Sequence, residues 1–290
     1  MRRVWFPLWL VAVLLQAPLS AAVFLTIAPD ARTIALGGAG VALDDMGAGA
    51  YYNPASIALG PRIAATWTHV DLLGPDGSLD HVAIALNRYG RFGLAAGLQY
   101  LNAFSGHMAD IAPGISSAYR VLPSLSAGLT AKAVYSFVYD VHALTFAVDA
   151  GVDYQPMNAL TLGLAVANLG PDMRVDSTAS SLPRIARLGF AFRPAIPGPV
   201  SALATAQVSR DLFPELSGNT PWHAGAGMEI GFSHLAFARV GYRYESFEGW
   251  KGFTWGVGLE HRGIRLDVGV DGYVVWVSAD RVRFQLSGHV

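Results

Sequence analysis

Apolar side chains occupy every second position along most of the chain. In residues 124–137, Leu125, Leu129 and Phe137 share one face, whereas Thr130 lies on the opposite face with serine, glycine and lysine. Successive side chains of a β-strand point to opposite faces, so this pattern predicts strands with one apolar face and one small or polar face.

The alternation recurs in about fourteen segments of roughly ten residues, which is the length that a tilted membrane-spanning strand needs. Glycine, proline and asparagine lie between many of these segments, as expected for the turns of antiparallel hairpins. The expected strands are 62–70, 79–88, 91–101, 113–121, 124–137, 143–155, 159–168, 184–193, 200–209, 222–232, 235–245, 253–262, 264–275 and 281–290.

Two features favour a barrel over a soluble β-sandwich, which would also alternate. The opposite faces are small and glycine-rich, whereas a soluble strand would carry charged side chains there. The apolar faces end in aromatic residues, and aromatic girdles lie at the two membrane interfaces of a barrel. These aromatic residues are Tyr100, Tyr119, Tyr154, Trp222, Tyr244, Trp255 and Trp276. We therefore expect an all-β protein, a transmembrane antiparallel β-barrel over residues 62–290.

The composition agrees with a membrane protein. Charged residues make up 14% of the chain, against about 25% in an average soluble protein, and the mean hydropathy is +0.36. Lys and Arg number 20 and Asp and Glu number 21, so the basic excess of a nucleic-acid-binding protein is missing. The absence of cysteine excludes disulfides, thiolate nucleophiles and cysteine-based metal or haem sites.

Residues 1–22 have the three parts of a secretory signal peptide. Arg2 and Arg3 precede an apolar run, and Ser20-Ala21-Ala22 supplies small residues for cleavage before Val23. A transmembrane anchor is the alternative, but the apolar run is shorter than the roughly 20 residues that a span needs. Export of a strand-rich apolar chain predicts a place in the bacterial outer membrane.

Residues 23–61 are apolar and rich in small residues, but they do not alternate. We expect this segment to form a hatch, or plug, inside the lumen of the barrel. Gly37 and Gly38 would permit tight turns. Asn53 would cap a short helix that has Pro54 as its first residue.

The same segment resembles the opening of the PorV/PorQ family of outer-membrane proteins, which share their architecture with the FadL fatty-acid transporters. The resemblance rests on Ala31-Arg32, Ala35 to Ala39, Asp44-Asp45 and Tyr52 to Ala55, and weaker similarity continues through the strands. The resemblance implies that a hatch motif comprises Arg32, Gly37, Gly38, Asp45, Tyr52, Asn53, Pro54 and Ala55.

Charged residues on the small faces are expected to point into the lumen. They are Lys132, Asp149, Asp153, Glu229, Glu260, Arg262, Arg265, Asp267 and Asp271. They would form either a polar path that contacts the plug or cross-strand pairs that hold wall and plug together, and their interleaved signs favour the pairs.

The chain lacks the common catalytic, phosphate-binding and metal-binding motifs, and His142 near Asp140 has no convincing catalytic partner, so we expect neither an enzyme nor a cofactor. The PorV/PorQ resemblance implies binding or anchoring of exported proteins in a type IX secretion-like role. The alternative is a FadL-like channel for the uptake of hydrophobic small molecules. The expected partners are outer-membrane lipid, an exported or secretion-system protein, or a hydrophobic small-molecule ligand.

Overall fold

The structure is a computed structural model of the whole chain. It describes residues 22–44, 48–72, 77–87, 91–175, 178–212, 222–246, 250–271 and 282–290. Residues 1–21 of the expected signal peptide, Asp45 of the resembled motif and Trp276 of the expected aromatic girdle lie outside the described residues.

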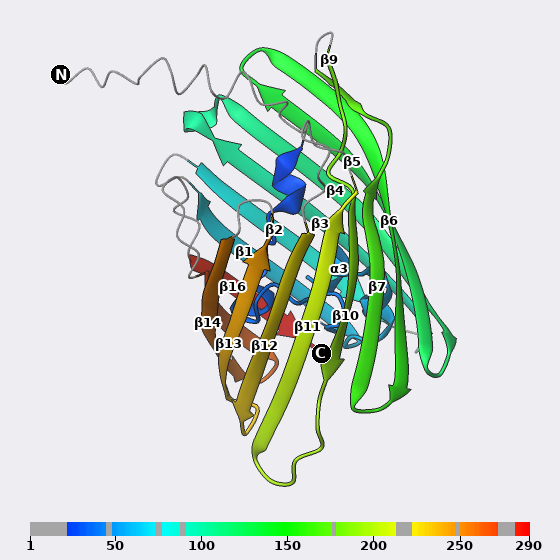
Figure 1. Cartoon of the computed structure of the whole chain (residues 1–290), viewed down its shortest axis with the longest axis vertical. Helices are drawn as coiled ribbons and strands as arrows, with labels where there is room; N and C mark the ends of the chain where they lie inside the picture. Colours follow the sequence, from blue (N-terminus) through cyan, green and yellow to red (C-terminus); the bar gives the residue numbers. More distant parts are fainter. Residues whose placement is uncertain are drawn as a thin grey trace, which may run out of the picture.

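Within these ranges, fourteen strands close into one antiparallel barrel, which confirms the predicted fold class. Strands that follow one another pair as neighbours, and β1 pairs with β16 to close the ring (Figure 1). The barrel strands are β1 (Ile63–Leu72), β2 (Gly77–Leu86), β3 (Phe92–Ala103), β4 (Met108–Leu122), β5 (Leu125–Val138), β6 (Val141–Met157), β7 (Leu160–Leu169), β10 (Ile185–Phe192), β11 (Val200–Asp211), β12 (Trp222–Phe232), β13 (Ala236–Glu245), β14 (Trp250–His261), β15 (Ile264–Asp271) and β16 (Val282–His289).

The two faces of the wall are those that the alternation predicts. On β5, Leu129 is 56% exposed on the outer face and the next residue, Thr130, is 7% exposed on the inner face. On β14 the same contrast separates Trp255, at 52%, from Thr254, at 0%. Large apolar side chains therefore cover the outside of the barrel, and small or polar side chains line its lumen.

Short helical segments precede the first strand and lie inside the barrel, where the blue part of the chain is seen in Figure 1. They are η1 (Val23–Thr26), α2 (Ala31–Ala35), α3 (Gly49–Tyr52) and η2 (Pro54–Ala58), and a further turn, η4 (Phe104–Gly106), joins β3 to β4. In the described ranges, no helix is both long and apolar enough to cross a membrane. We call residues 22–44 and 48–61 the plug.

The buried core lies between plug and wall. Phe24 and Leu25 pack against one part of the inner wall, Leu36 and Val41 against a second, and Ile57 against a third, where the wall residues are mainly alanine. The tightly packed interior of this protein thus consists of the N-terminal plug and the inner wall around it.

One feature of the wall was not predicted. A hairpin of β8 (Met173–Val175) and β9 (Thr178–Ser180) is inserted between β7 and β10 and forms a separate two-stranded sheet. Strands of three residues are too short to display an alternating pattern, so the sequence predicts only a connection here.

Candidate functional site

Hydrogen bonds attach the plug to strands all around the inner wall. At the start of the plug, Phe24 O accepts from Gln99 Nε2 of β3 at 2.9 Å. Further bonds reach β16, β14, β11, β6 and β4. In chain order the bonds are Ala31 N to Gln285 Oε1 at 2.9 Å, Gly37 N to Thr254 Oγ1 at 3.0 Å, Val41 N to Gln207 Oε1 at 2.9 Å, Asn53 Nδ2 to Asp153 Oδ1 at 2.8 Å, and Arg120 Nη2 to Ala58 O at 2.9 Å.

Glycines of the wall allow the plug to lie this close. A Cβ atom added at any of several inward glycines would fall under 3.0 Å from an atom of the plug, a distance that real Cβ atoms essentially never show. These glycines are Gly93, Gly128, Gly151, Gly163, Gly225, Gly227, Gly241, Gly256 and Gly269. The glycine-rich inner faces seen in the sequence therefore mark the track on which the plug lies.

Asn53 joins both halves of the plug to the wall. Its side-chain amide donates to Val41 O at 2.9 Å and to Asp153 Oδ1 at 2.8 Å, and its carbonyl oxygen caps η2 by accepting from Ala55 N at 3.0 Å. Pro54 is the first residue of η2. Earlier in the plug, Gly37 and Gly38 have φ angles of 74° and 78°, which fall in the left-handed region that favours glycine.

A buried ionic cluster holds the first half of the plug. Arg32 of α2 donates to both carboxylate oxygens of Glu229, at 2.9 Å each. Arg239 lies 2.6 Å from the same carboxylate and 2.8 Å from Asp267, and Arg265 lies 3.1 Å from Asp267. All five side chains are buried. We call them the Arg32 cluster, and buried charges of this kind are tolerated because each has an opposite partner.

The other charges expected in the lumen lie outside the Arg32 cluster or at its edge. Lys132 Nζ lies 2.8 Å from Asp149 Oδ2, Asp153 accepts from Asn53, and Asp271 pairs with Arg243 at 2.7 Å. Glu260 lies near Arg265 and His289, at 3.8 Å from each.

Arg262 does not point into the lumen. It is exposed in the turn between β14 and β15 with a φ of 51°, because the strand ends at His261. Arg239, in contrast, was missed. Its signal was an arginine on the same face of the expected strand 235–245 as Gly241 and Arg243, opposite Glu229 in the register.

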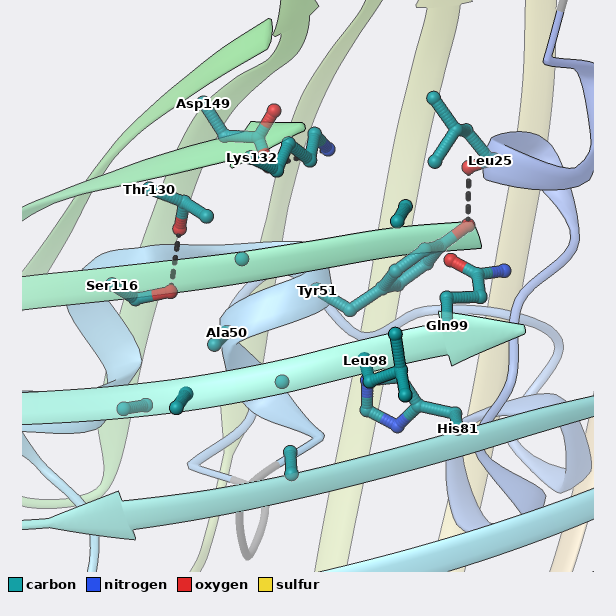
Figure 2. Close-up of a pocket in the computed structure, with 16 residues that line it drawn as sticks. Leu25, Ala50, Tyr51, His81, Leu98, Gln99, Ser116, Thr130, Lys132 and Asp149 are labelled. Carbon is teal, nitrogen blue, oxygen red and sulfur yellow. Dashed lines mark hydrogen bonds and ion pairs between the residues drawn. The ribbon is translucent and has the colours of Figure 1, made fainter. Parts of the chain in front are cut away.

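A pocket of about 60 Å³ lies between the plug and strands β2 to β6. Leu25 of η1 and Tyr51 of α3 form its plug side, and small residues form much of its wall side (Figure 2). These small residues include Ala83, Ala95, Gly97, Ala112 and Gly114.

The pocket glycines differ from those on the track of the plug. A Cβ atom at Gly97 or Gly114 would meet its nearest neighbour at 3.5 Å or 3.4 Å, and that neighbour belongs to the wall. The pocket is thus a stretch of small-residue wall that the plug leaves uncovered.

Polar groups interrupt this apolar lining. The Ser116 and Thr130 hydroxyls lie 2.8 Å apart, and the Lys132–Asp149 pair lies beyond them (Figure 2). On the plug side, the Tyr51 hydroxyl donates to Leu25 O at 2.8 Å. Burial raises the pKa of Tyr51 to about 12, so this phenol remains neutral at physiological pH.

The guanidinium of Arg187 lies 5.5 Å from the centre of the Tyr51 ring. A cation over an aromatic face is an attractive arrangement. This contact therefore helps to hold the Tyr51 ring in place on the plug side of the pocket.

Comparison with solved structures identifies barrels of the same fold. The toluene transporter TbuX of Ralstonia pickettii superimposes with a TM-score of 0.61 at 16% identity, covering 89% of this chain and 95% of its own. The monoaromatic hydrocarbon channel CymD gives 0.64 at 12% identity, covering 89% and 96%. A FadL homologue of Pseudomonas aeruginosa gives 0.56 at 11% identity, covering 89% and 97%.

No protein-family model matches the chain, and no curated protein matches it. At these identities the solved structures establish the fold and not the ligand. The chain thus has the fold of the FadL-like fourteen-stranded barrels, with an N-terminal plug and a small pocket between plug and wall.

Proposed function

We propose that this protein is a FadL-like channel of the bacterial outer membrane that admits hydrophobic small molecules. The observation that carries the proposal is the uncovered stretch of small-residue wall beside the plug. An apolar pocket with a few polar groups is the usual form of a small-molecule site. The hydrocarbon transporters TbuX and CymD share the fold and support this reading.

The outer face supports placement in a membrane. Large apolar side chains are exposed all around the wall, whereas a soluble barrel would have to cover them. A closed barrel pairs the backbone groups of its strands within the wall, which is what a hydrocarbon environment demands.

Passage of an aromatic molecule through the pocket requires movement of the plug. A cavity of about 150 Å³ holds a benzene molecule, and the pocket has about 60 Å³. Leu25 and Tyr51 belong to the plug, so a shift of η1 and α3 would widen the pocket without opening the wall.

The comparisons give no support to the PorV/PorQ resemblance or to a type IX secretion partner. The Asn53-Pro54-Ala55 element that contributed to the resemblance packs on Gly128 and Gly151 of the wall. Packing of the plug against the wall is therefore enough to explain why this motif is present. A channel and a secretion protein would both need such packing, so the motif does not distinguish between them. The transport reading is therefore the one we retain.

Uptake by whole cells tests the proposal, because toluene crosses plain phospholipid unaided and only an intact outer membrane resists it. Cells that lack FadL-type channels would express the full chain, and accumulation of radiolabelled toluene would be measured. Gly97→Leu fills the pocket and should reduce uptake to the level of cells without the protein. Ala131→Leu, which lies on the outer face, should leave uptake unchanged.

Equal uptake by the two variants would refute the role of the pocket. If cells with the unaltered protein took up neither toluene nor 4-methylphenol beyond the level of cells without it, while folded barrel was present in the outer membrane, the channel function itself would be rejected.

A further inference from the structure

The polar side of the pocket has hydrogen-bond donors to spare. An ammonium group has three N–H donors, and among the described residues the only hydrogen-bond partner of Lys132 is Asp149, at 2.8 Å. The Lys132 side chain is only 12% exposed, so bulk water supplies few partners. Two N–H groups therefore remain beside the pocket.

The carboxylate of this pair is already occupied on both oxygens. Asp149 Oδ2 accepts from Lys132, and Oδ1 accepts from the backbone N–H of Asn168 at 2.7 Å. The pair carries no net charge, and its spare hydrogen-bonding capacity is mainly that of a donor. A ligand with an acceptor oxygen would complement it, whereas a ligand anion would also meet the negative carboxylate of Asp149.

A second donor lies on the same wall. Thr130 precedes Lys132 by two residues on β5 and faces the same side, and its hydroxyl pairs with that of Ser116. One hydroxyl donates to the other, so one O–H of the two is left over within the part of the chain that the structure describes. Both groups border the small residues Gly97 and Gly114.

We propose that the pocket selects neutral, oxygen-bearing apolar molecules, of the class of phenols and small alcohols or ketones, over plain hydrocarbons and over carboxylates. The oxygen accepts from Lys132 Nζ, and the apolar body lies along the alanine and glycine wall of β3 and β4. This inference rests on the proposed channel function and specifies its ligand class. A hydrocarbon in the same place would leave the Lys132 donors buried without a partner, which is the basis of discrimination against it.

The test compares three probes that share a methylphenyl body: 4-methylphenol, toluene and 4-methylbenzoate. Their binding to the full chain in lipid nanodiscs is measured by calorimetry, with empty nanodiscs as the background. The unaltered protein should bind 4-methylphenol about tenfold or more tightly than either of the other probes. Equal binding of 4-methylphenol and toluene, or tightest binding of 4-methylbenzoate, would overturn the inference.

A double variant tests the residues. Lys132→Met with Asp149→Asn removes both charges together, so neither is left buried alone. The preference for 4-methylphenol over toluene should fall to within about twofold. The matched control, Arg243→Met with Asp271→Asn, removes a lumenal pair whose residues are not among those lining the pocket, and should keep the preference. Survival of the preference in the Lys132 and Asp149 variant would contradict the assignment.

The two proposals fail differently. If none of the probes binds the unaltered protein and whole cells take up none of them, the channel function is rejected together with the ligand class. If cells take up toluene and 4-methylphenol alike and both bind equally, the channel function stands and only the selectivity is rejected. The ranking of probes by the unaltered protein does not depend on the folding of any variant.

Discussion

Removal of the Arg32 charge should loosen the first half of the plug, residues 22–44, while the second half, residues 48–61, stays in place. Arg32→Met keeps an unbranched chain of similar reach and removes the charge. The three arginines of the neighbourhood, Arg32, Arg239 and Arg265, are balanced by Glu229, Asp267 and Glu260. The change therefore takes the local sum from 3 − 3 = 0 to 2 − 3 = −1 in a buried site.

The size of the effect follows from the bonds that are lost and kept. Two hydrogen bonds to a charged group disappear, each worth about 1.5 kcal/mol at the low end, so about 3 kcal/mol of plug docking is lost. Glu229 still has Arg239 at 2.6 Å and Arg265 at 3.4 Å, so it is not left without a partner. For this reason we use the low end of the energy range for each lost hydrogen bond. A loss of this size raises the equilibrium constant for opening about a hundredfold.

Thiol labelling would measure this opening, because the chain has no cysteine of its own. Thr33→Cys places a thiol next to Arg32, and Ser56→Cys places one in η2; both positions are buried. With Arg32→Met, maleimide labelling should accelerate about a hundredfold at position 33 and less than threefold at position 56, where Asn53 still binds the wall. Arg62→Met, at an exposed position outside the cluster, is the control.

Equal acceleration at the two positions would refute the idea that the Arg32 cluster holds mainly the first half of the plug and Asn53 the second. Acceleration of less than threefold at position 33 would show that the Arg32 pair contributes little to docking.

Three further predictions concern the wall and the plug. Leu129→Arg places a cation on the outer face and should lower the free energy of unfolding by about 2–4 kcal/mol near the bilayer midplane, whereas Thr130→Arg, on the lumenal face, should lower it less. Equal losses of stability in a urea refolding titration would contradict the assigned faces. Gly128→Ala should destabilise docking of the plug by about 1–3 kcal/mol through overpacking against Pro54 and Ala55 backbone, and Gly97→Ala should not, as thermal unfolding in detergent would report. Asn53→Ala should leave Asp153 without its amide donor, and proteolysis should then cut the plug faster than in the unaltered protein.

The fold was predictable because its signal is local. A strand of the wall shows its two faces within ten residues, as β5 and β14 do, and no distant contact is needed to read them. The closed antiparallel barrel confirms the prediction drawn from the strands. The glycine-rich inner faces, which favoured a barrel over a sandwich, are also the places where the plug lies against the wall.

The pocket was not predictable from the sequence. Leu25, Gly97 and Asp149 come together only because the ring closes and the plug lies within it. The choice of Arg262 over Arg239 as a lumenal charge had a similar cause. The end of β14 depends on a turn geometry at residues 262 and 263 that alternation does not reveal.

The order in which the plug meets the wall constrains how the protein assembles. Ala31, near the start of the chain, bonds to Gln285, which is 254 residues later. The start of α2 thus acquires this partner only when β16 joins the ring, and contacts so distant along the chain form slowly. Docking of α2 therefore requires a barrel that contains β16, whereas η1 can bond to β3 through Gln99 before the ring closes.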